Sequence, residues 1–208
     1  MSRYSEILHR FLPAGAVKPV LAWLDQHPVV LRISKKRFSR LGDYKPPQNG
    51  VDYHRISVNY DLNPYHFLLT LVHEMAHYHV WKAYKNRVKP HGREWQEEYY
   101  RLMKPFLNES IFPQEILPSV TEFVKKPGSS AARRRLEEAI RKLNGDVSHE
   151  PTVEDISENG LFRLQNGRIY RKGPKNRTRY KCLCVNNGRY YLVNGTFPAV
   201  PVTINEER

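Results

Sequence analysis

The segment LVHEMAHYHV, residues 71–80, places His73, Glu74 and His77 in an otherwise apolar run. Residues four apart on an α-helix project from the same face, so the two histidines can bring their ring nitrogens to one point. Glu74 points to the flank of that face, where a carboxylate can take a proton from a metal-bound water without being a ligand itself. This HExxH spacing predicts a zinc site together with the base of a hydrolytic reaction.

A zinc ion in a hydrolytic site needs a third protein ligand. His91 is the best candidate, because it stands where the next helix is expected to begin, and Gly92 beside it permits close approach. Glu94 and Glu97 are competitors, since a glutamate on a following helix supplies the third ligand in thermolysin-like enzymes. That glutamate usually lies further along the chain, which favours His91.

The alternative to a metal site is structural: the two motif histidines would be hydrogen-bonded core residues, and Glu74 would form a salt bridge. A charged glutamate between two histidines on an apolar helix is costly to bury without a partner. The metal site is therefore the preferred interpretation. No role is assigned to the other histidines near the motif, which are His54, His66 and His79.

The helix that carries the motif is predicted over about residues 64–85. Asn63 supplies an N-cap side chain, Pro64 presets the first turn, and apolar residues then continue without a breaker. A loop over residues 86–92 leads into a second helix over residues 92–107, whose aromatic and aliphatic residues recur at three- and four-residue intervals.

Apolar spacing and turn residues predict the flanking elements. Three further helices are expected over residues 4–12, 16–26 and 130–144. Branched residues predict strands of a small sheet over residues 28–34 and 54–60, whereas the stretch YKPPQNG, residues 44–50, is rich in turn formers. Prolines leave room only for short pieces between residues 108 and 128.

Beyond an acidic joint at residues 150–160, short β segments alternate with turns of the type NG, GPKN and NNG. Between residues 160 and 204 the sequence has nine Lys or Arg and no Asp or Glu, so positive charge is concentrated there. The expected core of this tail consists of Phe162, Ile169, Tyr170, Tyr180, Tyr190, Tyr191 and Val193.

The chain of 208 residues carries 34 basic and 21 acidic residues, a formal net charge of +13. Such an excess attracts polyanions, and nucleic acid is the leading candidate; a solubility surface, a ribosome and a membrane surface are the alternatives. There is no long uncharged apolar run and no signal-peptide core. The two cysteines, Cys182 and Cys184, are too few for a disulfide framework. We therefore expect a soluble cytoplasmic protein without a membrane span.

The stretches VHEMAH and KPHGREWQEEY, residues 72–77 and 89–99, resemble the SprT-like family of zinc metallopeptidases, which includes bacterial SprT proteins and eukaryotic Spartan proteases. The resemblance covers about half of the chain. It implies an α+β fold, with a zincin-like helical domain and a small sheet, in which His73, His77 and His91 bind zinc and Glu74 is the base. Many members end in a zinc ribbon with two cysteine pairs. With two cysteines, this tail is expected to be a metal-free, cysteine-poor version of that β-rich unit.

The resemblance also implies a function, a zinc-dependent peptidase that acts on protein held on DNA, as in proteolysis of DNA–protein crosslinks. The expected organisation is a metallopeptidase domain over residues 1–112, a helical linker over residues 113–158 and a basic β-rich module over residues 159–208. The leading candidates for phosphate contacts are Arg171, Lys172, Lys175, Arg177 and Arg179. The alternative function is a nucleic-acid-binding protein whose zincin-like domain has little or no catalytic turnover.

Overall fold

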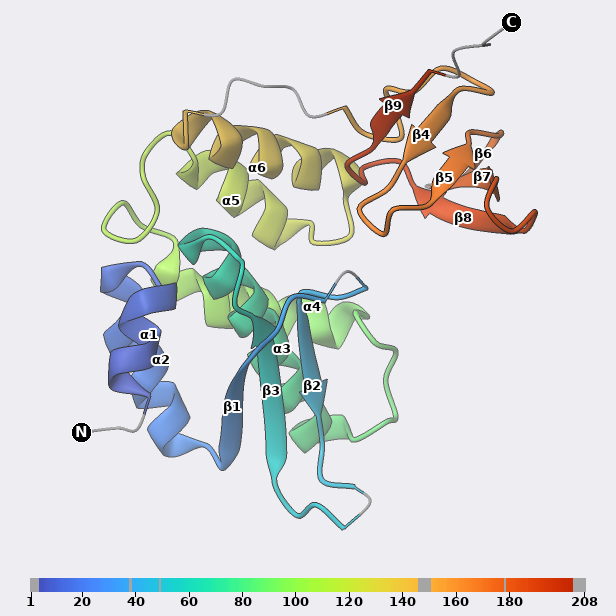
Figure 1. Ribbon diagram of the computed structural model, residues 1–208. Helices are drawn as coiled ribbons and strands as arrows, with labels where there is room; N and C mark the ends of the chain where they lie inside the picture. The colour runs from blue at the N-terminus through green and yellow to red at the C-terminus, as the bar shows by residue number, and fades with distance from the viewer. Residues whose placement is uncertain (1–3, 38, 49, 146–150, 178, 204–208) are drawn as a thin grey trace, which may run out of the picture. The chain divides into compact units, whose positions relative to one another are not determined.

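The computed structural model describes residues 4–37, 39–48, 50–145, 151–177 and 179–203 (Figure 1). The chain divides into two compact units, Met1–Leu143 and Asn144–Arg208, and each has its own hydrophobic core. Helices together with one mixed and one antiparallel sheet confirm the predicted α+β class. Among the described residues, no helix combines the length and the apolar character needed to cross a membrane.

The sheet of the first unit has the order β1-β3-β2. Strands β1 (Val29–Ser34) and β3 (His54–Asn59) pair in parallel, and both agree with the strands predicted from branched residues. Strand β2 (Gly42–Lys45) runs antiparallel to β3 at the edge of the sheet. It was not predicted, because its short sequence GDYK lacks an alternating apolar pattern and leads into the turn formers that follow.

Helix α3 (Pro64–Tyr84) packs against β2 and β3 and carries the HExxH motif. Its N-terminus confirms the predicted cap: the Asn63 side-chain oxygen accepts a hydrogen bond from the backbone N–H of His66 at 2.9 Å, and Pro64 occupies the first turn. The helix ends at Tyr84, because the next residue, Lys85, has a positive φ of 54° that breaks the helical conformation. In Figure 1, α3 lies behind the strands of the small sheet.

The other helices of the first unit surround α3 and the sheet. Helix α4 (Arg93–Met103) follows the loop after α3, packs against α3 and continues into a short 3-10 turn, η1 (Lys104–Phe106), that begins next to Pro105. Helices α1 (Ser5–Phe11) and α2 (Ala14–Gln26) open the chain, in agreement with the two short helices predicted there.

Residues 113–143, which the sequence suggested as part of a linker, contribute to the core of the first unit. They form α5 (Leu117–Lys125) and α6 (Ser130–Leu143), the second of which agrees with the predicted amphipathic helix. Their fully buried side chains join the same hydrophobic cluster as α3 and α4, and they are Val120, Val124, Leu136 and Ile140.

The described part of the second unit is a six-stranded sheet of the order β6-β7-β5-β4-β9, with β8 paired to β7. All of these pairings are antiparallel. The strands are β4 (Leu161–Arg163), β5 (Ile169–Arg171), β6 (Lys175–Asn176), β7 (Arg179–Cys184), β8 (Tyr190–Asn194) and β9 (Val200–Val202). Gly167 and Gly188 have positive φ angles in the turns between strands, as the NG dipeptides indicated.

One face of this second sheet forms the core of the unit. Most of the predicted core residues lie there, and both cysteines are buried beside them as free thiols. The prediction for Tyr190 was wrong: this side chain is 63% exposed. Tyr190 is paired with Leu183 and therefore lies on the opposite face of the sheet from Cys182 and Cys184, because successive residues of a strand alternate between faces.

Candidate metal centre

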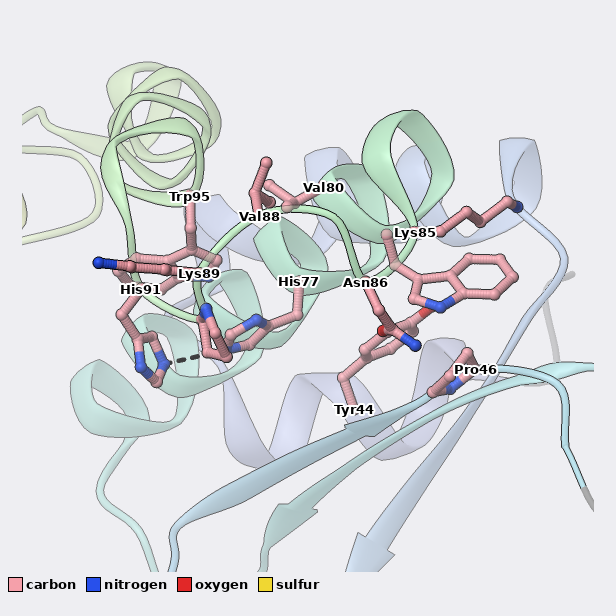
Figure 2. Close-up of a pocket in the computed structure, with 12 residues that line it drawn as sticks. Tyr44, Pro46, His77, Val80, Lys85, Asn86, Val88, Lys89, His91 and Trp95 are labelled. Carbon is pink, nitrogen blue, oxygen red and sulfur yellow. Dashed lines mark hydrogen bonds between the residues drawn. The ribbon is translucent and has the colours of Figure 1, made fainter.

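Three histidine side chains from two segments meet at one point of the first unit. His73 and His77 lie one turn apart on α3, and His91 ends the loop before α4. The Nε2 atom of His77 lies 3.2 Å from that of His73 and 3.0 Å from that of His91, and the third distance, from His91 to His73, is 3.1 Å. Figure 2 shows the rings of His77 and His91 facing one another. The structure thus brings together the three residues predicted as ligands.

The spacing of these nitrogens fits a shared cation. Three nitrogens bound at about 2.0–2.1 Å to one tetrahedral zinc ion lie about 3.3 Å from one another. The observed separations of 3.0–3.2 Å are close to that value. A neutral imidazole has one N–H and one acceptor nitrogen, so three Nε2 atoms that face each other cannot all donate. One cation can satisfy all three lone pairs, and among the described residues these histidines form the group with metal-ligand spacing.

All three rings are held in the neutral form, which is the form that binds a metal. Burial lowers the pKa of His73 to about 2, and the neighbouring His77 and His91 add to the effect. Burial likewise lowers the pKa of His77 to about 4, with His91 as the second cause. The pKa of His91 is also lowered by burial. The same surroundings that disfavour a protonated ring leave its lone pair free for a cation.

His91 reaches the centre through an unusual backbone conformation. Its φ angle is 57°, in the left-handed region that is uncommon for residues other than glycine. The loop is fixed on both sides of it: the N–H of Gly92 donates to the Lys89 carbonyl at 2.9 Å, and the side chain of Gln96 donates to the His91 carbonyl at 3.0 Å. Such conformations persist where surrounding contacts impose them, often at functional sites.

Trp95 on α4 forms an aromatic wall against the three histidines. Its ring centroid lies 4.4 Å from that of His73, 5.3 Å from that of His77 and 4.7 Å from that of His91. The side chain is buried and stacks in turn on Tyr99, one helical turn further along α4. Trp95 therefore fixes the orientation of the imidazole rings and keeps water from one side of the centre.

Glu74 is the buried acid of the site, with 6% of its surface exposed. Burial raises the pKa of this carboxyl to about 8, the nearby Asp43 adds to the rise, and a hydrogen bond from the backbone of Tyr44 acts in the opposite direction. Strand β2 passes directly against it: a Cβ atom added to Gly42 would lie 2.6 Å from Glu74 Oε1. The edge strand thus places a glycine where a larger residue would collide with the carboxylate.

The competing ligands suggested by the sequence lie elsewhere. Glu97 forms an exposed ion pair with Arg93, with Nε and Oε1 2.7 Å apart. Neither Glu94 nor Glu97 belongs to the cluster with metal-ligand spacing. His91 is the third member of that cluster because the loop after α3 reverses the chain before α4 begins.

The other histidines near the motif make structural contacts. His79 Nε2 accepts a hydrogen bond from the Trp23 indole N–H at 2.9 Å. His54 Nδ1 lies 2.8 Å from the Tyr44 hydroxyl, and His66 sits in the first turn of α3, where its Nδ1 lies 2.9 Å from the side-chain nitrogen of Asn63. These rings support α3 and the edge strand from outside the centre.

The residues predicted to contact phosphate divide into two groups. Arg171, Arg177 and Arg179 are exposed on the second unit, and Lys175 is exposed but pairs with Glu154 at 2.8 Å. Lys172 differs, because it is 7% exposed. Its ammonium group donates to the backbone carbonyl of Glu154 at 2.9 Å and to that of Ile156, and it lies over the Tyr180 ring. Lys172 thus serves the core of the second unit, which removes it from the surface available to phosphate.

Two residues of the centre were not found from the sequence. Trp95 fits the pattern only as an apolar position of the second helix, and its contact with the histidines depends on how α4 packs on α3. Gly42 lies 32 positions before Glu74, in a strand without a clear pattern, so no local signal could have indicated its role.

Comparison with known proteins gives one result for the first unit. Residues 21–118 match the model of the SprT-like family, and this segment contains β1 to β3, α3 and α4. Searches of curated proteins and of solved structures gave no match. The three clustered histidines and Glu74 all lie inside the matched segment. Residues 21–118 of the chain are thus similar to the SprT-like family, the family that the sequence predicted.

Proposed function

We propose that this protein is a zinc-dependent peptidase whose centre is formed by His73, His77 and His91, with Glu74 as the general base. One observation carries the proposal: three Nε2 atoms lie within 3.2 Å of one another, and the residue after the first of these histidines is a buried carboxylic acid. The match of residues 21–118 to the SprT-like family supports it, because that family is associated with zinc and metallopeptidases.

The three imidazoles would hold the metal through their Nε2 atoms, each in the neutral form that burial favours. When bound, a zinc ion supplies a Lewis acid that lowers the pKa of a water molecule and polarises a carbonyl group. Trp95 keeps the rings oriented from one side.

Glu74 would accept the proton of the attacking water at its carboxylate and deliver it to the nitrogen of the departing amine. A base must be ionised, and burial, with Asp43 as the second cause, raises the pKa of this carboxyl to about 8. The carboxylate ionises more readily beside a cation, so Glu74 becomes an effective base when the centre is loaded. A pKa raised by burial and lowered by a cation lies closer to neutral pH, where general bases act best.

The proposed substrate is protein held on DNA, with the second unit as the part that binds nucleic acid. Its exposed arginines, Arg171, Arg177 and Arg179, lie in a region without any Asp or Glu between residues 160 and 204. The excess of basic residues over the whole chain, +13, acts in the same direction.

A second candidate function is nucleic-acid binding with little turnover, and one feature of the second unit favours it. The face of the second sheet opposite its core exposes Tyr190 and Leu192 beside Lys181, whose ammonium group lies 4.6 Å from the Tyr190 ring centroid. Alternating aromatic and basic side chains are typical of surfaces that bind single strands, where bases stack on rings and phosphates pair with cations. Such a surface does not require a peptidase.

Glu74→Gln separates the two functions. If the protein is a peptidase, this variant keeps the zinc content of wild type and loses cleavage of a protein substrate, tested with and without DNA. His91→Ala serves as the matched metal-site variant, and elemental analysis should show that it loses zinc. Wild-type protein that contains zinc but cleaves no substrate under any DNA condition would leave the binding function as the better account.

A further inference from the structure

A pocket opens beside the three-histidine centre (Figure 2). Its lining includes His77, His91 and Trp95, and in Figure 2 these three residues lie on one side of it, with Lys85 and Pro46 on the other. The rest of the lining comes from the edge strand β2, the last turns of α3 and the loop before α4. Two candidate metal ligands are thus also walls of the pocket.

The chemistry of the walls is apolar and basic. The apolar side chains are Tyr44, Pro46, Val80, Trp81, Val88, Pro90 and Trp95. The charged side chains are Lys85 and Lys89, and no described residue contributes a carboxylate to the lining. The Lys85 ammonium group lies 3.7 Å from the centroid of the Trp81 ring, so a positive charge covers one face of this aromatic wall.

The size of the pocket suits a single amino-acid side chain. Its volume is ≈ 240 Å³, which is below the roughly 300–1,000 Å³ of pockets that hold drug-sized ligands. A flat aromatic or long aliphatic side chain would bury its surface against Trp81, Tyr44 and the valines. A lysine or arginine side chain would enter a pocket whose charged lining residues are Lys85 and Lys89, and like charges repel one another. In the described part of the chain, the lining offers it no carboxylate to pair with.

We propose that this pocket binds a large apolar side chain of the polypeptide substrate, next to the peptide bond that is cut. It prefers aromatic to aliphatic side chains and excludes lysine and arginine. The inference rests on the proposed peptidase function. It follows from the shared walls, because a side chain seated between His77 and Trp81 places its own backbone beside the three imidazoles.

The experiment uses a set of alanine-rich peptides that differ at one position, which is Phe, Ala, Glu or Lys. Cleavage sites and rates are followed by mass spectrometry with zinc-loaded protein. Affinities of the same peptides for metal-free protein are followed by NMR shift changes. We expect the Phe peptide to exceed the Ala peptide by at least about tenfold in both measurements, since burying such a side chain in an apolar pocket is worth that much or more.

Two variants test the pocket itself. Val88→Trp fills the pocket from the loop and should remove the preference for Phe, whereas Tyr84→Trp adds the same ring at an exposed position that does not line the pocket and should leave it intact. The double variant Lys85→Glu and Lys89→Glu should reverse the exclusion of Lys. Zinc content should stay at the wild-type level in all three proteins.

The outcomes separate this inference from the proposed function. Cleavage that depends on Glu74 but shows no preference for Phe, or the same preference in Val88→Trp, overturns the pocket assignment and leaves the peptidase standing. An absence of cleavage in wild type overturns the peptidase. In that case the affinities decide: binding of the Phe peptide that Val88→Trp abolishes supports the pocket as a side-chain site, and binding that Val88→Trp leaves unchanged overturns it.

Discussion

Glu74 can act as a base only if its carboxylate keeps one position, and a residue far along the chain controls that position. Gly42 on β2 leaves the space that Glu74 occupies, since a Cβ atom there would lie 2.6 Å from Oε1 and 2.9 Å from Cγ of the glutamate. The Cγ2 atom of Thr70, one helical turn earlier on α3, would lie 2.7 Å from the same Cβ. Because α3 fixes the backbone of both residues, their side chains would have to give way. We therefore infer that Gly42 positions the proposed base.

Gly42→Ala should lower kcat by about 100-fold, because a misplacement of about 1 Å in a catalytic group can have that effect. Zinc content should be unchanged, since none of the three atoms nearest to the added methyl group belongs to the clustered histidines. Steady-state kinetics and elemental analysis on the same preparation measure both. Gly128→Ala is the control, because no described atom lies within 4 Å of the added methyl group. Equal kcat values for the two variants would show that Gly42 has no positioning role.

The pKa values of the site make the stability of the metal-free protein depend on pH. Burial raises the pKa of Glu74 from 4.5 to about 8, so between these values the folded state keeps a proton that the unfolded chain has released. Stability therefore falls as the pH rises through this range. The histidines act oppositely, because their lowered pKa values make stability fall as the pH drops below 6.5. From pH 6.5 to 8 the histidines change stability little, so the fall in stability that Glu74 causes remains.

In that window the metal-free wild type should lose up to about 1.4 kcal/mol of unfolding free energy per pH unit. Glu74→Gln should show none of this loss, because the amide does not titrate. Urea unfolding in the presence of a chelator, followed by tryptophan fluorescence, measures it, and all three tryptophans lie in the first unit. Parallel pH profiles for the two proteins would contradict the assignment of the slope to Glu74.

At the scale of single residues, the sequence predicted those parts of the centre that depend on helix geometry. His73 and His77 bring their ring nitrogens to the same point because they are four residues apart on one helix. The role of Glu74 as a base, which the same motif indicates, stays a prediction. His91 could be predicted because it is a histidine between two predicted helices. Gly42 and Trp95 could not be predicted, because each acts through tertiary contacts that leave no pattern in the local sequence.

At the scale of elements, the predictions were good where apolar periodicity is long and poor where strands are short. Helix α3 begins at the predicted residue and ends one residue before the predicted end. Strand β2, four residues long, was missed, although it borders Glu74 and lines the pocket through Tyr44. Short edge strands are defined by pairing with a neighbour, here β3, and not by their own composition.

The packing of helices α5 and α6 against the rest of the first unit could not be predicted from the sequence either. The apolar face of α6 was visible in its sequence, but the surface that it covers was not. Leu136 is 1% exposed and belongs to the cluster that contains Leu71 and Tyr99, on the helices of the metal centre. We infer that these helices stabilise the first unit, most of whose remaining residues lie inside the family match.

Leu136→Ala should lower the unfolding free energy of the first unit by about 2–5 kcal/mol, as expected for a buried leucine replaced by alanine. Glu138→Ala is the control on the exposed face of α6, where removal of its solvent-screened pair with Lys142 should leave stability close to that of wild type. Tryptophan fluorescence during urea unfolding reports both. Near-equal stabilities of the two variants would mean that α6 is not part of this core.

At the scale of the whole molecule, the sequence shows how much positive charge each unit carries, and the structure shows which of the charged side chains are exposed. The sequence predicts a basic second unit, but the alternation of a strand decides which side chains face solvent. Arg179 and Lys181 on β7 lie on the exposed face, and Arg171 on β5 pairs with Leu183 on that same face. Lys172, the next residue, points into the core.

This exposed face gives a quantitative prediction for nucleic-acid binding. The double variant Arg171→Gln and Arg179→Gln should weaken binding of a single-stranded DNA oligonucleotide, and the slope of log affinity against log salt should become shallower by about 0.7 for each phosphate that the variant no longer neutralises. Lys18→Gln, an exposed lysine on α2 in the first unit, is the control and should keep the wild-type slope. Fluorescence anisotropy at several salt concentrations measures the slopes. If the double variant keeps the wild-type slope, phosphate is bound elsewhere, and the positive charge of the second unit serves another purpose.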